Sequence, residues 1–427
     1  MKKIGILIDC RTDIKNIDAI ENGNPGIGGS EYQLLQLYHY LKKDGEYNCT
    51  LYAIENGGTA TDNNAICLKS DEDAIKKAAE DKIDIFVFIP KNKEEKFYEE
   101  LLNFNLKSVA WVHNYIPYNV IKSLSNCKSV KRVIFVSKQH YDCYIDDRLI
   151  NKSDYIYNML SFATHNFIYP DEKKPIVTYI GALIPTKGFH KLAKVWKKVL
   201  KKVPAAKLQV IGSGKLYDKN AVLGKYLIAE AKYEKKILKY LSDKNGKILD
   251  SVTFYGSLGI EKDKLIEKTK VGIANPTGKS ETFCLSAVEY KTYGIPVVSY
   301  RGFGIFDTVR NGTDGILIKS SKELENAIVE LLTDNRKNYE YGKNGLTDGF
   351  TDFLPNKIIL QWKKNFCDIC SETDVQIKKP TDHFSDDFKW LKIINFYLKH
   401  TLHIKCHSVA YTVSRSKEFI KSILKKR

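Results

Sequence analysis

The feature that most constrains the fold is the alternation of short β-branched and aliphatic runs with longer amphipathic segments along most of the chain. This alternation is typical of βα units that build parallel sheets. A polar segment, residues 169–175, interrupts the pattern after five runs, and the pattern then starts again. We therefore predict an α/β protein with two successive doubly wound domains. The predicted strands are residues 3–8, 49–54, 83–89, 108–112 and 132–136 in the first domain and residues 176–180, 207–211, 252–255, 271–274, 296–300 and 315–318 in the second.

The length of the chain agrees with this division, because 427 residues exceed what one hydrophobic core normally organises. We predict the first domain over residues 1–170 and the second over residues 175–355. Residues 356–376 and a basic amphipathic extension, residues 377–427, follow. Doubly wound sheets bind ligands outside the carboxyl ends of their strands. A cleft between two facing Rossmann-like domains is therefore the predicted active site.

The N-terminal apolar run predicts a cytoplasmic protein. It contains only five residues, Ile4 to Ile8, before Asp9, which is too short for a signal peptide or a membrane span. The nine cysteines of the chain are then expected to be reduced thiols rather than a disulfide framework.

Two of the cysteines, Cys367 and Cys370, have the spacing of metal ligands. Further residues of ligand type lie downstream: His400, His403, Cys406 and His407. A lone pair of this spacing inside a helix-like stretch is more often coincidental than a zinc site. We therefore predict no metal site here.

The formal net charge of +17 admits nucleic acid, an anionic membrane or anionic small molecules as partners. About half of the excess lies in residues 388–427, where ten Lys or Arg stand against one acid, Glu418. Aromatic and aliphatic side chains are interleaved with these basic residues, which suits an interfacial anchor on an anionic membrane. Such an anchor would place the protein on the inner face of the cytoplasmic membrane. The alternative is that the aromatic residues pack on the first domain and the lysines are solvated.

Nucleic acid is the less favoured partner. Basic residues are not interleaved with aromatic residues on any candidate sheet face, and no recognised nucleic-acid-binding module is present. We therefore expect no nucleic-acid binding, although a basic nucleic-acid-binding protein remains an alternative.

Glycines cluster where a doubly wound sheet places its ligands. Gly28 and Gly29 precede Ser30, which we predict to cap a helix whose amide groups can hold phosphate oxygens. In the second half, Gly181 ends a strand and Lys187 stands at a strand-to-helix mouth, where a cation and free amides favour a diphosphate. Each feature alone is also compatible with a turn or with a solvated lysine.

Two carboxylates, Glu281 and Glu289, are eight positions apart. Glu281 falls in a Gly/Ser/Thr-rich loop after a predicted strand, whereas Glu289 falls inside the helix that follows. This placement allows two acceptors at different depths along one elongated polyhydroxyl ligand, with backbone amides between them facing its phosphates. Either residue alone would be an ordinary helix-terminal or surface glutamate.

Residues 176–332 resemble the donor-binding domain of the retaining family-four glycosyltransferases, also called glycosyl transferases group 1, which have the GT-B fold. Six pieces match in the order that the family has. They are YIGALIPTKG (179–188), VIGSG (210–214), VTFYG (252–256), ETFCLSAVE (281–289), GIPVV (294–298) and NGTDG (311–315). The resemblance also implies that the helix expected from residue 356 crosses back to the first domain.

Carried over residue by residue, the resemblance assigns Lys187 to the donor diphosphate, Glu281 to hydroxyls of the donor sugar and Glu289 to the ribose. His113, after a strand of the first domain, matches a family histidine close to the donor sugar. The catalytic residues implied are Glu281, Lys187 and His113. The further donor-binding residues implied are Gly28, Gly29, Gly181, Gly212, Gly256, Phe283, Cys284, Leu285 and Glu289.

One position departs from the family pattern. The family often has an arginine directly after the first glycine of this domain, where this chain has Ala182. Either Lys187 carries the diphosphate charge with less help, or another cation, such as Arg301 or Lys215, substitutes.

The resemblance implies a hexosyl transfer that retains the anomeric configuration and uses a nucleotide-diphosphate sugar as co-substrate, without a metal or another cofactor. The acceptor implied is a glycan or a lipid-linked glycan, as in bacterial cell-envelope polysaccharide synthesis. The acidic triplet 71–73 follows Ser70 and is better explained as the first turn of a helix than as a metal site. A nucleotide-sugar epimerase of similar build remains an alternative.

Overall fold

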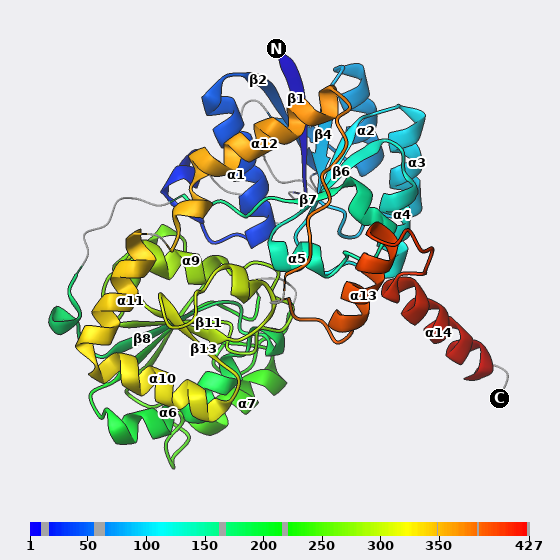
Figure 1. The fold of residues 1–427 in the computed structure, drawn as a ribbon. Coiled ribbons are helices and arrows are strands. Elements are labelled where there is room, and N and C mark those ends of the chain that lie inside the picture. The colour runs from blue at the N-terminus through cyan, green and yellow to red at the C-terminus, as the bar shows by residue number, and fades with distance from the viewer. Residues whose placement is uncertain are drawn as a thin grey trace. The chain divides into compact units, whose positions relative to one another are not determined.

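The computed structural model describes residues 1–9, 17–54, 65–161, 168–215, 221–347, 349–381 and 384–424. Its contacts group the chain into two compact units (Figure 1). Unit 1 comprises Met1–Ile17, Leu34–Tyr157 and Ile358–Arg427, and unit 2 comprises Asp18–Gln33 and Asn158–Lys357. A loop from the N-terminal part of the chain therefore packs with unit 2.

Unit 1 is built on a seven-stranded parallel sheet in the order β3-β2-β1-β4-β5-β6-β7. Its central strands are continuous apolar runs because helices cover both faces of such a sheet. The strands are β1 (Lys2–Asp9), β2 (Tyr47–Ile54), β3 (Ala65–Leu68), β4 (Ile85–Phe88), β5 (Ser108–Val112), β6 (Val130–Phe135) and β7 (Ser153–Tyr155).

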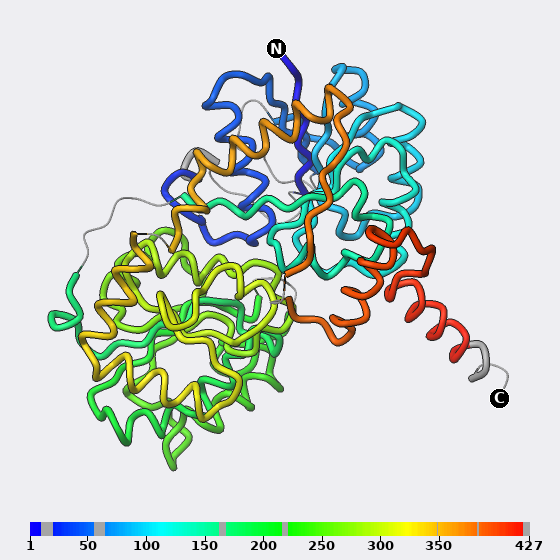
Figure 2. The backbone as a smooth tube through the Cα atoms, in the orientation of Figure 1, coloured from blue at the N-terminus to red at the C-terminus, as the bar shows by residue number. Residues whose placement is uncertain are grey.

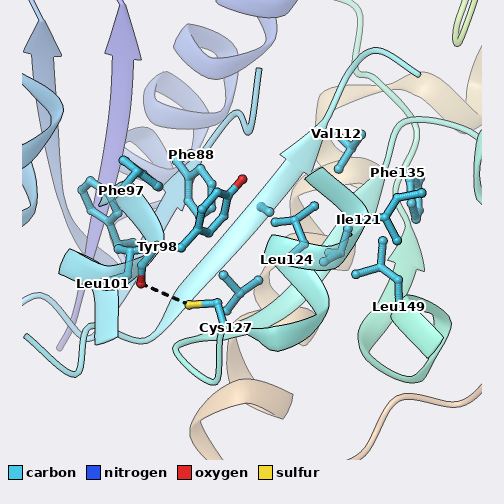
Figure 3. Packing of buried hydrophobic residues seen from close by; sticks show 14 of the residues in the cluster. Phe88, Phe97, Tyr98, Leu101, Val112, Ile121, Leu124, Cys127, Phe135 and Leu149 are labelled. Atoms are coloured by element: carbon cyan, nitrogen blue, oxygen red, sulfur yellow. Dashed lines mark hydrogen bonds between the residues drawn. The ribbon is translucent and has the colours of Figure 1, made fainter. Parts of the chain in front are cut away.

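Helices of unit 1 supply the rest of its core. They are α1 (Gly29–Asp44), α2 (Asp71–Glu80), α3 (Glu95–Asn103), α4 (Tyr118–Asn126), α5 (Lys138–Asp142) and α12 (Pro355–Cys370). Phe88 of β4 packs on Phe97 of α3 at 4.8 Å between ring centroids, and the Cys127 thiol donates to the carbonyl of Tyr98 (Figure 3). From Ile358 on, α12 belongs to unit 1, where Trp362 packs on Trp111 of β5.

Unit 2 is built on a six-stranded parallel sheet in the order β10-β9-β8-β11-β12-β13. Its strands are β8 (Ile176–Ile180), β9 (Lys207–Ile211), β10 (Val252–Gly256), β11 (Val271–Ala274), β12 (Val297–Tyr300) and β13 (Gly315–Ile318). The strand order reverses between β8 and β11. The loops after these two strands therefore flank the crevice at which doubly wound sheets bind ligands.

The helices of unit 2 are α6 (Phe189–Lys202), α7 (Ala231–Leu241), α8 (Asp263–Ile266), α9 (Leu285–Thr292), α10 (Ser321–Thr333) and α11 (Asn335–Thr347). Helix α6 shows why the lysine-rich sequence is helical. Its apolar stripe, which includes Leu192, Trp196 and Val199, is buried in the core, whereas Lys201 and Lys202 stand in its last turn near the negative end of the helix dipole.

Two strands escaped prediction. Both β3 and β7 lie at an edge of their sheet, and both are short and partly exposed, so neither has the apolar run by which a buried strand is recognised. The other strands and the two doubly wound sheets are confirmed. The division into residues 1–170, 175–355, 356–376 and 377–427, and the cleft between facing domains, stay predictions.

The predicted cap of α1 is wrong. The amide of Tyr32 donates to the carbonyl of Gly28 at 2.9 Å, so the helix begins at Gly29 and Ser30 lies within its first turn. The helix predicted at the acidic triplet is confirmed. It is α2, and the Ser70 hydroxyl accepts from the amide of Asp73 at 3.1 Å.

The C-terminal extension contains two helices, α13 (Lys389–His400) and α14 (Val409–Leu424), reached by a stretch of chain after α12 (Figure 2). Helix α13 packs on the rest of unit 1 through Phe396, which is buried in the core, and through two polar side chains. Lys392 Nζ donates to the carbonyl of Cys143 at 2.7 Å, and Asn395 Nδ2 donates to Asp146 Oδ2 at 3.1 Å. None of the helices in the described ranges is both long enough and apolar enough to cross a membrane.

Candidate functional site

The loops after β8 and β11 bring the predicted cation and the first predicted carboxylate together. Lys187 Nζ lies 2.8 Å from Glu281 Oε2, and the side chains are 19% and 10% exposed. Asn275 Nδ2 donates to the same carboxylate oxygen at 2.8 Å. Lys187 and Glu281 are 94 positions apart in the sequence, so the topology of the sheet creates this contact.

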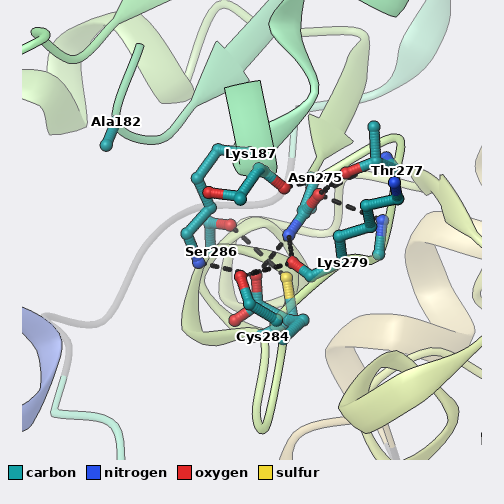
Figure 4. A network of polar contacts seen from close by, with 12 residues as sticks. Ala182, Lys187, Asn275, Thr277, Lys279, Cys284 and Ser286 are labelled. Atoms are coloured by element: carbon teal, nitrogen blue, oxygen red, sulfur yellow. Dashed lines mark hydrogen bonds and ion pairs between the residues drawn. The ribbon is translucent and has the colours of Figure 1, made fainter. Parts of the chain in front are cut away.

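Asn275 also shapes the loop that presents Glu281. Its Oδ1 accepts from the Thr277 hydroxyl at 2.9 Å and from the amide of Gly278 at 3.1 Å, which is an Asx-type turn. The turn needs left-handed backbone at Gly278, where φ is +64°. Figure 4 shows Lys187, Asn275 and Thr277 in one polar network, and Ala182 lies apart from it.

The loop then enters α9 at Leu285, and the predicted phosphate-facing amides are those of Leu285 and of the two residues before the helix, Phe283 and Cys284. The amide of Leu285 donates to the carbonyl of Phe283 at 3.1 Å and is therefore engaged within the chain. The Cys284 amide has no partner among the described residues. Burial raises the pKa of the Cys284 thiol to about 12, so this side chain is a neutral packing group at neutral pH.

The second predicted carboxylate, Glu289, lies inside α9 and has a partner that the sequence did not reveal. Lys262 Nζ lies 3.0 Å from Glu289 Oε1 and donates to the carbonyl of Asn24 at 3.3 Å. Lys262 ends a 3-10 turn, Ile260–Lys262, and is almost fully buried. Lys262 stands in an ordinary charged stretch of the sequence, so its contact with Glu289 could not be predicted before the fold was known.

The hydrogen bond from Lys262 to Asn24 connects Glu289 with the loop that leads to Gly28 and Gly29. Asn24 Oδ1 accepts from the amides of Gly26 and Ile27 at 2.9 Å each, which closes a second Asx-type turn. A Cβ placed on Gly29 would lie 3.3 Å from Leu285 Cδ1. A Cβ on Gly28 would lie 2.2 Å from Glu31 Oε2, so glycine at this position makes room for the folded-back glutamate. Gly29 thus lies beside the start of α9, and the role of Gly28 and Gly29 in binding a donor stays a prediction.

Three predicted glycines end adjacent strands and form a continuous backbone edge. The amide of Gly181 donates to the carbonyl of Ile211 at 3.0 Å, and the amide of Gly212 donates to the carbonyl of Gly256 at 2.7 Å. A Cβ on Gly212 would lie 1.9 Å from the Gly181 carbonyl oxygen. Only glycine at Gly212 allows β8 and β9 to end so close together.

Ala182 stands at the position where the family often has an arginine, and it is buried. Arg301 and Lys215, the suggested substitutes, are both exposed. Lys262 is the second cation that the described fold does bring to the site, beside Glu289 rather than beside Glu281.

His113, the remaining predicted catalytic residue, belongs to unit 1. It follows β5, its ring lies 4.6 Å from that of Trp111, and burial lowers its pKa to about 3. His113 is therefore neutral at any physiological pH. Its approach to the donor sugar stays a prediction.

The described residues include no group of three or more His, Cys, Asp or Glu side chains placed to hold a metal ion. Cys367 and Cys370 both lie on α12, where Cys367 is exposed and Cys370 is half-buried.

Comparisons with known proteins find similarity to glycosyltransferases. The model of one family, glycosyl transferases group 1, matches residues 163–348. An uncharacterized glycosyltransferase of Haemophilus influenzae is 24% identical over 277 residues, which are 62% of this chain and 70% of that protein. A capsular polysaccharide biosynthesis glycosyltransferase of Staphylococcus aureus, CapM, is 25% identical over 173 residues, and this match spans 40% of each chain.

A solved structure of Anabaena HepE in complex with UDP and glucose resembles this chain with a TM-score of 0.62. The similarity covers 86% of this chain and 100% of that chain at 16% identity. It shows the fold, and that fold is GT-B.

Proposed function

We propose, from the premise that residues 163–348 form a glycosyl transferases group 1 domain, that the protein is a retaining hexosyltransferase. It moves a sugar from a nucleotide-diphosphate sugar to a glycan or a lipid-linked glycan in bacterial cell-envelope polysaccharide synthesis. One observation carries the proposal. Lys187 and Glu281 come from the two loops at the point where the strand order of unit 2 reverses, and they meet at the start of α9.

In the proposed reaction the bond between the anomeric carbon and the phosphate oxygen breaks, and a bond to the acceptor oxygen forms on the same face. The acceptor proton passes to a phosphate oxygen of the departing nucleoside diphosphate. The negative charge that grows on this leaving group is the main barrier to the reaction. A preorganised cation and amide dipoles in a shielded site stabilise such charge by several kcal/mol, about 3 for a single donor.

Lys187 is the cation suited to that charge, together with the amide of Cys284 at the positive end of α9. Glu281 is suited to accept hydroxyls of the donor sugar, and Asn275 holds its carboxylate in place. Glu289 is suited to accept ribose hydroxyls, and Lys262 fixes its position. The glycine edge Gly181, Gly212 and Gly256 and the loop at Gly28 and Gly29 leave room for a ligand to approach the backbone.

The stereochemistry of the product tests this proposal. An α-linked donor should give an α-linked product, read from proton coupling constants of the isolated glycoside. A β-linkage would contradict the retaining mechanism. Incubation with donor alone separates the epimerase alternative, because a transferase leaves the sugar configuration unchanged and an epimerase releases the epimerised sugar.

We also propose that α13 docks the protein on an anionic membrane, with the bilayer as its occupant. Helix α13 packs on unit 1 through a face that mixes polar and apolar side chains, since Lys392, Asn395 and Phe396 are all buried and Phe396 belongs to the core of unit 1. On the remaining surface of the helix, Trp390 and Ile394 are 67% and 55% exposed. The helix is thus held by hydrogen bonds and by Phe396, and it still leaves apolar side chains exposed, as an interfacial helix requires.

Charge on the adjoining segment complements an anionic lipid surface. Lys405, Arg415 and Lys417 are exposed on or just before α14, with Glu418 as the neighbouring acid. Each basic residue near an anionic leaflet contributes about 1 kcal/mol. The extension therefore combines exposed apolar side chains with flanking cations, and these two features together support the proposed docking.

Co-sedimentation with phosphatidylglycerol vesicles tests the docking. Trp390→Ser with Ile394→Ser should lower vesicle binding at least about tenfold. Each of these side chains, once buried in the bilayer, contributes about 1.5 to 3 kcal/mol to binding. Leu360→Ser is the matched control, since Leu360 is a 63% exposed leucine of α12 outside this face. Equal binding by the double variant and the control would contradict the proposal, and so would equal binding to neutral phosphatidylcholine vesicles.

A further inference from the structure

A second recess in unit 2 lies outside the residues assigned to the donor. It is a cavity of about 480 Å³ at the carboxyl ends of β11, β12 and β13, and the first turns of α6 and α10 contribute to its wall. Thr186 and Thr277 belong to its lining, but neither Lys187 nor Glu281 does. Its volume falls in the range of small-molecule sites.

The polar lining of this cavity is cationic. His190, Lys191, Lys236, Lys279 and Lys319 line it, and none of its fourteen lining residues is acidic. The four lysine ammonium groups make no hydrogen bond or ion pair within the described part of the chain. This differs from Lys187 and Lys262, whose ammonium groups are each paired with a glutamate.

Three of the lysines are close enough to act on the pKa of His190. The pKa of His190 is lowered to about 4, first by burial and then by Lys236, Lys191 and Lys279. The Tyr233 hydroxyl accepts from the amide of His190 at 3.2 Å and lies 3.1 Å from His190 Nδ1. In the tautomer that carries its proton on Nε2, the neutral ring accepts from the Tyr233 hydroxyl at Nδ1 and offers Nε2 as a donor.

Serine side chains add polar groups to the lining. Helix α10 starts at the cavity, and its cap residue Ser320 and the following Ser321 belong to the lining. The carboxylate of Glu323, which is outside the lining, accepts from the amide of Lys319 at 2.8 Å and offsets the positive end of the α10 dipole. The positive potential of the cavity therefore comes from its four lysines, which no carboxylate in the lining offsets.

We propose that this cavity is a binding site for a phosphate-type oxyanion, separate from the site of the donor diphosphate. A multiply charged tetrahedral anion accepts hydrogen bonds from several ammonium groups at once. It also removes the repulsion among the cations, which neutral or cationic ligands would not do. The anion has two sources, free inorganic phosphate or a phosphate group carried by the acceptor. The site goes beyond the transferase proposal and does not depend on it.

Calorimetric titration with inorganic pyrophosphate tests the site in the full-length chain. The comparison is made in a Lys187→Ala background, which weakens binding at the donor site. Lys236→Ala with Lys279→Ala should weaken pyrophosphate binding at least about tenfold, as expected for the loss of two charge-assisted hydrogen bonds. The control pair Lys235→Ala with Lys244→Ala removes the same charge from exposed positions outside the cavity and should change the affinity less than about twofold.

Equal affinity of the two pairs would overturn the proposal. If the cavity pair fails to fold, nuclear magnetic resonance of the unsubstituted chain decides the question. The ring signals of His190 should shift during pyrophosphate titration, and signals that do not move would overturn the site.

A transfer assay distinguishes the two sources of the anion. With an acceptor that carries phosphate, the cavity pair should raise KM for that acceptor but not for its phosphatase-treated form. If free phosphate is the ligand instead, KM stays the same for both acceptors, and inorganic phosphate raises the Tm of the unsubstituted chain but not that of the cavity pair. The pyrophosphate titration needs no turnover, so failure of the transferase proposal and failure of the site are separable.

Discussion

Unit 2 contains two groups of lysines that differ in their partners. At the proposed donor site Lys187 and Lys262 each form an ion pair with a glutamate, whereas the lysines of the cavity, such as Lys236 and Lys279, have no acidic partner in its lining. A paired group offers both positive charge and carboxylate acceptors to a ligand. An unpaired group offers positive charge alone. The first therefore suits a nucleotide sugar, which carries phosphates and hydroxyls, and the second suits a simple oxyanion.

The two groups also rest on different scaffolds. The residues proposed to bind the donor include the glycine edge, where a Cβ on Gly212 would lie 1.9 Å from the Gly181 carbonyl oxygen, whereas none of the fourteen residues that line the cavity is a glycine. Substitutions in the first region should therefore affect folding and turnover strongly, and substitutions in the second should affect mainly anion binding.

The largest effect is expected from Gly212→Ala. Its Cβ would lie 1.9 Å from the Gly181 carbonyl oxygen, and φ of +141° adds strain, so the free energy of unfolding should fall by about 4 kcal/mol. Gly246→Ala is the control, because Gly246 has φ of +79° but nothing within 4 Å of its added Cβ. The control should lose only about 1 kcal/mol. Urea unfolding measures both, and equal losses would contradict the close packing of β8 and β9.

Next in size is the effect of Lys187→Ala on turnover. Loss of the diphosphate cation should lower kcat at least about a hundredfold, which is about 2.7 kcal/mol of transition-state stabilisation. Glu281→Gln should have an effect of similar size. Lys235→Ala, an exposed lysine of α7, should leave kcat unchanged. Steady-state kinetics with the true donor and acceptor measures both variants. Full turnover by Lys187→Ala would contradict the assignment of Lys187 to the site.

A smaller effect is expected from Lys262→Met, which leaves Glu289 half-buried without its cation. Since the two side chains are 7% and 18% exposed, the free energy of unfolding should fall by about 2 kcal/mol. Adding Glu289→Gln should restore part of this loss, because the uncompensated charge is then removed. A double-mutant cycle that shows no coupling would contradict the structural role of the pair.

The smallest effect concerns Lys279→Ala, which removes one of the charges that depress the pKa of His190. The pKa should rise from about 4 toward its ordinary value of about 6.5. Because the folded-state pKa is lowered, the contribution of His190 to stability is complete above about pH 6.5 and is lost as the pH falls toward 4. The variant should lose less stability in this window. A pH titration followed by nuclear magnetic resonance checks the shift, and an unchanged pKa would contradict the crowding of cations.

The sequence predicted the two sheets because buried parallel strands are continuous apolar runs. It failed at β3 and β7, whose edge positions remove the need for such runs. It also left open which side of an amphipathic helix faces the protein. Helices α6 and α13 both mix lysines with apolar residues, yet α6 buries only apolar residues such as Trp196, and α13 buries Lys392 and Asn395 together with Phe396. Periodicity reveals a stripe, but only the surface that receives the helix decides which stripe is buried.

The sequence allowed prediction of those parts of the candidate site that lie in motifs following the strands. Lys187 and Glu281 lie in the loops after β8 and β11, and Gly181 and Gly212 directly follow β8 and β9, so the rule for doubly wound sheets places them at one edge. Lys262 and the cationic cavity were not predictable, because their residues come from loops and helices far apart in sequence. Only the folded chain brings Lys236 of α7 and Lys279 of the β11 loop to the same recess.

Titration with nucleoside diphosphates tests most directly whether the paired lysines form the donor site. Uridine, guanosine, adenosine and cytidine diphosphates are titrated in turn into the unsubstituted chain, Lys187→Ala and the pair Lys236→Ala with Lys279→Ala. The tightest ligand should bind Lys187→Ala at least about tenfold more weakly, as loss of a charge-assisted hydrogen bond requires. Its affinity for the cavity pair should change less than about twofold. Full affinity in Lys187→Ala together with a loss in the cavity pair would contradict the assignment and would place the nucleotide in the cavity instead.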